Sequence, residues 1–172
     1  MFVVSLIIKF MDCPTELHLQ SAKRILRYLK GTIDFGVFYN NEGNEKLIAY
    51  TDSDCVGDLD DRKSTSGYVF MLSSGAMSWS SKKQPMVSLS TTEAEFTATT
   101  SCACQAIWLR RILEGLNHAQ HDSTTVYYDN SSTIKLSKNL VMHGHCKHID
   151  VCFHFLRELT KDGIVEMVHC HT

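Results

Sequence analysis

The sequence lacks a dominant charge: 17 basic and 19 acidic residues give a formal net charge of -2 at pH 7. A chain without a global basic field must hold any nucleic-acid partner through local patches of positive charge. Internal repeats, low-complexity tracts and linkers are also missing, whereas hydrophobic residues make up 44% of the 172. These features predict a globular chain with a sizeable core, organised as one domain with an appendage.

Paired cysteines are missing as well. The seven cysteines are an odd number, they are scattered from Cys13 to Cys170, and none of them forms a CxxC pair. This usage is typical of reduced thiols rather than of a disulfide framework. We therefore expect an intracellular protein, cytoplasmic or nuclear and not secreted.

The sequence also has no run of apolar residues long enough to span a bilayer. The apolar start, MFVVSLIIKFM, is too short to cross a membrane, and it has neither a basic n-region nor a small-residue cleavage site. We expect no membrane partner, and we interpret this start as a helix or strand cut from something longer.

Hydrophobic periodicity and turn residues predict the elements that are present. An amphipathic helix is expected between Asp12 and Gly31, because the apolar residues Ala22, Ile25 and Leu29 recur at helical spacing. Two strand hairpins are expected next, pairing residues 36–39 with 46–52 and residues 67–72 with 76–81. The expected elements after them are a long helix from 90 to 115, a strand at 124–129, a short helix at 131–139, a helix at 148–163 and a strand at 164–170.

Three carboxylates occupy comparable positions in this scheme. Asp52 ends one strand, Asp129 ends a later strand, and Glu95 lies in the first turns of the helix between them. Because the carboxyl ends of strands and the neighbouring helix ends converge in such sheets, the three acids can meet in space. Clustered carboxylates repel one another unless a cation joins them, and hard divalent ions prefer oxygen ligands. Taken singly, each acid is explained more simply as a turn cap or a helix-dipole partner.

The sequence around the acids resembles a known family over roughly Phe35 to the C-terminus. The segments that carry the resemblance are IAYTDSDCVGD, LDDRKSTSGYVFML, SWSSKKQPMVSLSTTEAEF, VYYDNSSTIKLSKN and KHIDVCFHFLREL. Together they resemble the ribonuclease H domain of copia-type retrotransposon polyproteins. The preceding HLQSAKRILRYLKGT resembles the segment that joins the reverse transcriptase to that domain. We therefore expect residues 1–34 to be a remnant of the reverse transcriptase region and residues 35–172 to be a ribonuclease H-like domain.

The resemblance implies a fold and an activity. The expected fold is α/β, a ribonuclease H-like five-stranded mixed sheet flanked by helices. The family's C-terminal helix and its fourth metal-binding acid are missing from the sequence, and Asp150 is a poor substitute because it precedes the last strand. The implied activity is metal-dependent hydrolysis of the RNA strand of RNA-DNA hybrids during reverse transcription. The implied partners are the hybrid and the upstream reverse transcriptase domain.

The resemblance also assigns the site residues. Asp52, Glu95 and Asp129 match the family's catalytic acids and would bind two Mg2+ ions, with Mn2+ as a substitute. In this assignment Asp52 bridges both ions, and Glu95 and Asp129 each bind on one side of the pair. Asp54 and Glu93 are not assigned to the site, because their positions on the strand and the helix do not point their side chains toward the other acids.

Two alternatives stay open. The chain could be an inactive, truncated retrotransposon remnant that folds or binds hybrid without cleaving it. It could also be a zinc-binding module, because histidines and cysteines cluster near its end, although the usual paired ligand spacing is missing. The residues of that cluster are His143, His145, Cys146, His148, Cys152, His154, His169, Cys170 and His171.

Overall fold

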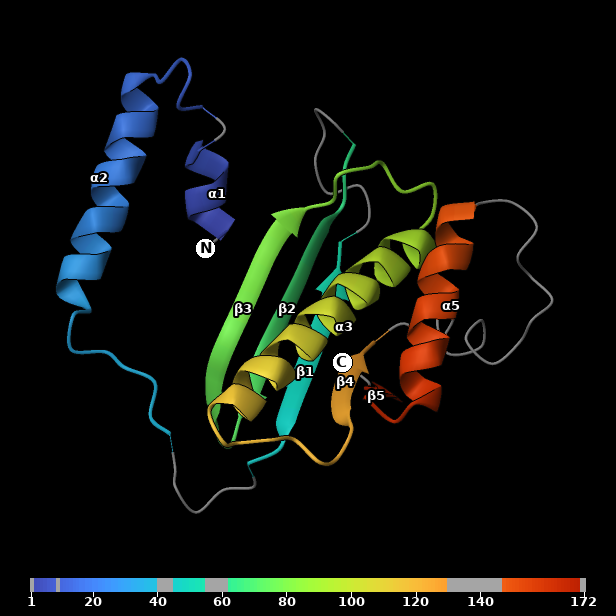
Figure 1. Cartoon of the computed structure of the whole chain (residues 1–172). Coiled ribbons are helices and arrows are strands. Elements are labelled where there is room, and N and C mark those ends of the chain that lie inside the picture. The colour runs from blue at the N-terminus through green and yellow to red at the C-terminus, as the bar shows by residue number, and fades with distance from the viewer. Residues whose placement is uncertain (1, 9, 40–44, 55–61, 130–146, 171–172) are drawn as a thin grey trace. The chain divides into compact units, whose positions relative to one another are not determined.

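The computed structural model describes residues 2–8, 10–39, 45–54, 62–129 and 147–170 (Figure 1). The chain separates into two compact units, Met1–Tyr39 and Asn40–Thr172. The expected division after residue 34 therefore falls inside the first unit. The assignment of residues 1–34 to a reverse transcriptase region stays a prediction.

The first unit contains two helices, α1 (Phe2–Ile8) and α2 (Glu16–Gly31). Helix α2 is the amphipathic helix that the apolar spacing predicts, and it begins after Thr15, whose backbone N–H donates to His18 Nδ1 at 3.0 Å. No residue of α2 is buried. The apolar side of α2 therefore gains little from packing, although such burial is what usually stabilises a helix of this length.

The second unit is built on a five-stranded mixed sheet with the strand order β3-β2-β1-β4-β5. Strands β1 and β2 pair antiparallel, as do β2 and β3, whereas β1 and β4 pair parallel, as do β4 and β5. The predicted fold class is confirmed by this sheet and its flanking helices. The strands are β1 (Leu47–Ser53), β2 (Thr65–Leu72), β3 (Gly75–Lys83), β4 (Thr124–Tyr128) and β5 (Val165–His169).

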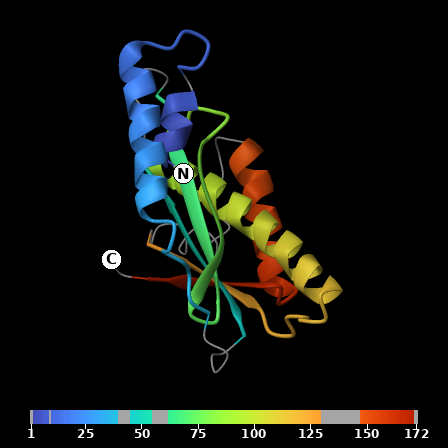
Figure 2. The same ribbon diagram turned by 90° about the vertical axis from the view of Figure 1, so that its left-hand side faces the viewer.

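Helical crossovers make the two parallel pairings possible, because a tight turn cannot join parallel strands. Helix α3 (Thr91–Gly115) runs between β3 and β4, and α5 (Lys147–Lys161) lies between β4 and β5. Figure 2 shows both helices on the same face of the sheet. The core lies between that face and α3, with Phe70, Phe96 and Val126 among its fully buried side chains.

Side-chain alternation along β1 decides which face each residue occupies. Leu47, Ala49 and Thr51 are buried, whereas Tyr50 and Asp52 are exposed. Tyr50 stacks on Tyr127 of β4 with a distance of 5.0 Å between ring centroids. Asp52, one residue before the end of β1, therefore has its side chain accessible to solvent rather than in the hydrophobic core.

One predicted strand is wrong. Residues 36–39 are not in a strand, so the first expected hairpin does not form. Strand β1 pairs with β2 on one side and with β4 on the other, and this leaves it no free edge for a third neighbour. The second hairpin, the long helix, the 124–129 strand, the next helix and the last strand are confirmed. The short helix predicted at 131–139 lies outside the described residues.

Two further expectations concern the described part of the chain. The cysteines that the structure describes with a placed thiol, Cys13, Cys102, Cys104, Cys152 and Cys170, are free and form no disulfide. Among the described helices, none has both the length and the apolar character needed to cross a membrane.

Candidate metal centre

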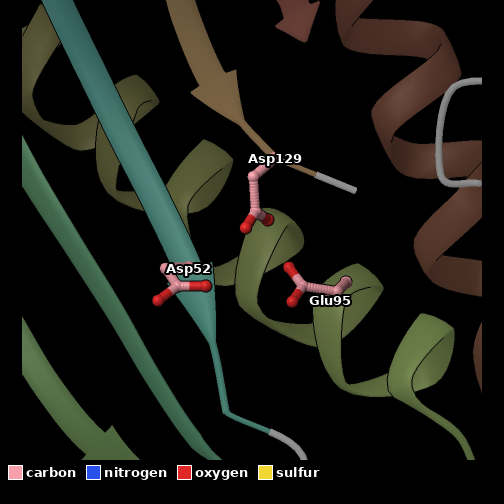
Figure 3. A group of neighbouring side chains, drawn as sticks. All are labelled: Asp52, Glu95 and Asp129. Carbon is pink, nitrogen blue, oxygen red and sulfur yellow. The ribbon is translucent and has the colours of Figure 1, made fainter. Parts of the chain in front are cut away.

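Three carboxylates converge at one end of the sheet (Figure 3). Asp52 comes from β1, Glu95 from α3 and Asp129 from the residue after β4, and one oxygen of each lies within 4.8 Å of the others. Among the described residues, no other group of histidine, cysteine, aspartate or glutamate side chains gathers in this way. The expected convergence of the three acids is observed, and their catalytic role stays a prediction.

Strand register brings the two aspartates together. Tyr50 and Tyr127 are partners in the parallel β1–β4 pairing, so Asp52 and Asp129, each two residues further on, come to the same end of the sheet. Strand β5 supports this end: the ring Nε2 of His169 lies 2.8 Å from the Asp129 carbonyl oxygen, to which it donates, and the Cys170 N–H donates to Tyr128 O at 2.9 Å.

Helix α3 brings the third acid because its start is fixed by local hydrogen bonds. The N-cap residue Ser90 accepts from the Glu93 N–H at 3.1 Å, and Glu93 Oε2 accepts from the Leu89 N–H at 2.7 Å. The bond to Ser90 satisfies a donor that the first turn of a helix leaves free, and the residue before the N-cap is fixed by its bond to Glu93. Glu95 follows two residues later and points toward the aspartates in Figure 3.

Burial and charge act together on Glu95, which is only 6% exposed. Burial, the largest cause, and the negative charges of Asp129 and then Asp52 together raise the pKa of the Glu95 carboxyl to about 7, and a hydrogen bond from the Ser53 backbone opposes them. Glu95 Oε2 is buried and has no hydrogen-bond partner among the described residues. An oxygen of this kind is costly to leave unpaired.

The donor set fits a hard divalent cation. All three side chains offer oxygen, which Mg2+ prefers, and a cation would both neutralise the mutual repulsion and give Glu95 Oε2 a partner. The two aspartates also line an open groove of about 410 Å³, together with Tyr50, Tyr127 and Gly67. A ligand bound to the acids is therefore reachable from solvent.

Stability without metal is expected to depend on pH through Glu95. Because folding raises the pKa of this carboxyl from 4.5 to about 7, the folded state favours its protonated form. The stability gained is complete below the unfolded pKa and is lost as the pH rises through about 7. In chelator, the urea midpoint of the wild type should fall between about pH 5 and pH 8 more steeply than that of Glu95→Gln, whose amide does not titrate. Equal slopes would contradict the raised pKa.

The two neighbouring acids that the sequence set aside have other partners. Asp54 accepts a hydrogen bond from the Thr65 backbone N–H, and Glu93 caps the start of α3. Asp150, on α5, is not part of the converging group. No sequence pattern indicated Gln84, whose side chain contacts Ser53 and Ala94, the chain neighbours of Asp52 and Glu95.

The cluster proposed for zinc falls largely outside the described part of the chain, which excludes His143, His145, Cys146 and His171. Nothing is described of the His148 side chain either. Within the described residues, Cys152, His154, His169 and Cys170 do not form a group of three or more metal ligands. The zinc alternative stays a prediction without a described site.

A second groove, of about 530 Å³, lies where residues near the start of β1 meet residues that follow α3. Two pairs of its residues lie close together: Lys46 Nζ lies 2.6 Å from Asp122 Oδ2, and His118 Nδ1 lies 3.6 Å from Glu45 Oε2. Although this groove is larger, none of its described lining residues has a buried polar side-chain atom without a hydrogen-bond partner. The acid cluster, with an unpaired buried oxygen, is the stronger candidate for a ligand site.

Sequence comparisons relate the chain to transposon proteins. No family model matches it. The chain is 42% identical over 170 residues to the retrovirus-related Pol polyprotein from transposon TNT 1-94 of Nicotiana tabacum, a match that covers 98% of this chain and 13% of that polyprotein. It is 39% identical over 171 residues to the corresponding polyprotein from transposon RE1 of Arabidopsis thaliana, covering 99% of this chain and 12% of that one. The chain thus spans a small part of these relatives.

A third relative is named secreted RxLR effector protein 161, from Plasmopara viticola. It is 43% identical over 106 residues, which is 62% of this chain and 75% of that protein.

Solved structures define the fold. The crystal structure of LC11-RNase H1 in complex with an RNA/DNA hybrid matches with a TM-score of 0.52 and 13% identity, over 73% of this chain and 86% of that one. The structure of the foamy viral protease-reverse transcriptase dRH in complex with double-stranded DNA matches with a TM-score of 0.65 and 12% identity, over 99% of this chain and 28% of that one. The protein has a ribonuclease H-like fold. Together with the transposon relatives, the fold shows that the chain is related to a segment of retrotransposon Pol polyproteins and that this segment is ribonuclease H-like in structure.

Proposed function

We propose that this chain hydrolyses the RNA strand of RNA-DNA hybrids as the ribonuclease H domain of a copia-type retrotransposon polyprotein. The observation that carries the proposal is the convergence of Asp52, Glu95 and Asp129, with the unpaired buried oxygen of Glu95, in a ribonuclease H-like fold. Three carboxylates at a solvent-accessible sheet end suit a reaction that needs divalent cations next to a phosphate.

The three acids would hold two Mg2+ ions, or Mn2+ in their place. Ions bound there supply Lewis acidity, which lowers the pKa of an attacking water and stabilises the leaving oxygen of the phosphodiester. Figure 3 shows the three acids around a common space, and the family resemblance assigns to Asp52 the role of holding both ions. Hydrolysis forms a bond from the water oxygen to phosphorus and breaks the bond from phosphorus to the 3′-oxygen, which leaves a 3′-hydroxyl and a 5′-phosphate.

Selectivity for RNA would come from the 2′-hydroxyl at the cut, which distinguishes RNA from DNA. In this proposal Glu95 would also position that hydroxyl, as the family resemblance implies. The upstream unit would then be the tail of the reverse transcriptase region, with residues 35–172 as the ribonuclease H-like domain. The proposed partners are the hybrid and the reverse transcriptase of the same polyprotein.

Coverage favours the transposon relatives as the guide to function. They match 98% and 99% of this chain, whereas the effector protein matches 62% of it. A relative that matches nearly the whole chain constrains the acid site and the elements around it together. A secreted role therefore has weaker support than reverse transcription.

The decisive experiment is cleavage of end-labelled RNA by the 172-residue chain. The RNA is offered as a hybrid with DNA and as a free single strand, and the same sequence is offered as duplex DNA, each with Mg2+, with Mn2+ or with chelator. We expect cutting of the RNA in the hybrid only, and only with metal, because the acids need cations to approach a phosphate. Uncut hybrid in the presence of a folded chain would contradict the proposal and favour the inactive remnant.

A further inference from the structure

Gln84 connects the strands of the sheet with the start of α3. It directly follows β3 and is only 4% exposed, so its amide group lies in the interior. Its backbone N–H donates to Ser64 O at 2.8 Å. A buried amide is tolerated when its hydrogen bonds are made, and these bonds then fix the groups on either side of it.

The side chain of Gln84 makes hydrogen bonds with three segments and a longer contact with a fourth. Its Nε2 donates to Ser66 Oγ of β2 at 2.7 Å and to Ala94 O of α3 at 2.8 Å, with a longer contact of 3.3 Å to Ser53 Oγ of β1. Its Oε1 accepts from Ser88 Oγ, in the loop before α3, at 2.7 Å. One amide therefore joins β1, β2, the loop and the helix.

One of these bonds and the longer contact are made to residues next to the acids. The Ala94 carbonyl belongs to the peptide group that continues into Glu95, and Ser53 directly follows Asp52. The Ser53 N–H in turn donates to Asp52 Oδ1 at 2.8 Å. Gln84 therefore connects the main chain that carries Asp52 with the main chain that carries Glu95.

We propose that Gln84 is a positioning residue that holds the start of α3 against Ser66 of β2, the register partner of Ser53 in β1, and so keeps Glu95 and Asp52 at the separation that metal binding requires. The acids repel one another when they are ionised, and this repulsion favours movement of the helix start away from the strand. The Gln84 amide opposes that movement through hydrogen bonds of 2.7 and 2.8 Å. The inference rests on the proposed function, because it assigns Gln84 to the same metal site.

The test compares Gln84→Met with Gln120→Met in the 172-residue chain. Methionine keeps the length of glutamine and removes its hydrogen bonds. Gln120 is a matched control because its amide also links distant segments, accepting from the Leu47 N–H at 2.9 Å and donating to Glu45 O at 3.1 Å, yet it lies at the other end of β1. Binding of Mn2+ is measured by calorimetry without hybrid, and hybrid cleavage is measured as a function of metal concentration, both well below the melting temperature of each variant.

We expect Gln84→Met to weaken Mn2+ binding about 10- to 100-fold, the usual cost of losing a group that supports metal ligands, and to raise the metal concentration for half-maximal cleavage in proportion. Gln120→Met should keep wild-type metal dependence even though it loses stability. Ser88→Ala, which removes only the hydroxyl that donates to Gln84 Oε1, should move metal dependence in the same direction by a smaller factor. This second variant tests the inference if Gln84→Met does not fold.

The outcomes separate the two proposals. A wild type that binds Mn2+ and cuts hybrid, with Gln84→Met or Ser88→Ala showing unchanged metal dependence, would overturn the positioning role alone. A purely structural role would lower the melting temperatures of the variants and leave metal dependence alone, and that result also counts against the inference. A folded wild type that neither binds metal nor cuts would overturn the proposed function together with the inference.

Discussion

Replacing Asp52 with asparagine is expected to reduce metal-dependent cleavage of the hybrid by at least about a hundredfold while the protein stays folded. Asparagine has nearly the same shape, but it removes one negative charge from the group of three acids. A cation would then be held by two carboxylates rather than three, and the ligand suited to contact both ions would be neutral. The measurement is single-turnover cleavage at saturating hybrid.

The same substitution should not destabilise the metal-free chain. The charge of Asp52 contributes to the raised pKa of Glu95, so removing it moves this pKa back toward its ordinary value and relieves repulsion in the folded state. A melting temperature in chelator equal to or above that of the wild type is the expected companion result. An unchanged or higher melting temperature would show that Asp52→Asn loses cleavage activity without unfolding.

Asp54→Asn is the matched control. Asp54 is the same type of residue, it is exposed, and it follows the same strand, but it bonds to the Thr65 N–H and stands outside the converging group. Its variant should cut hybrid as the wild type does. Full activity of Asp52→Asn, or equal losses in both variants, would mean that the three acids are not the site.

Replacing Phe70 with alanine should have the largest effect on stability, about 3–5 kcal/mol of the free energy of unfolding. Phe70 lies in β2 with no exposed surface, packs edge-on against Tyr68 with 5.5 Å between ring centroids, and belongs to the core beneath α3. Its removal costs transfer free energy and leaves a cavity that the rigid sheet cannot close. Since domains are stable by only about 5–15 kcal/mol, the variant should be largely unfolded at modest denaturant.

Urea denaturation followed by circular dichroism measures this effect. Phe38→Ala provides the comparison, because Phe38 is 83% exposed and its loss should change stability by no more than about 0.5 kcal/mol. A loss for Phe70→Ala no larger than that for Phe38→Ala would show that the core does not lie where the structure places it.

Local patterns predicted most of this fold because their signals lie within a few residues. Ser90 and Glu93 stand at capping-box spacing, and the structure contains the bond from the Glu93 N–H to Ser90, while the Glu93 side chain accepts from Leu89, one residue before the N-cap. The turn residues Ser73 to Gly75 predicted the β2–β3 hairpin for the same reason. The strand expected at 36–39 failed because pairing depends on a free neighbouring edge, which sequence periodicity does not report.

The candidate site was predictable in part. The family resemblance identified all three acids, and the β1–β4 register brings the aspartates together. The connections made by Gln84 could not be predicted, because its partners Ser53, Ser66, Ser88 and Ala94 come from four segments. A single glutamine carries no local pattern that distinguishes such a role from an exposed position.

The parallel pairing of β1 with β4 also determines when, during folding, the carboxylates meet. The β2–β3 hairpin and helix α3 depend on nearby contacts, whereas Asp52 and Asp129 are separated in the chain by β2, β3 and the whole of α3. Pairing β1 with β4 closes a long loop and lowers the conformational entropy of the chain before the contacts between the strands form. Such pairings therefore form slowly. An intermediate with the hairpin and α3 in place would lack the acid cluster, so the capacity to bind metal would arise late, with the parallel pairing itself.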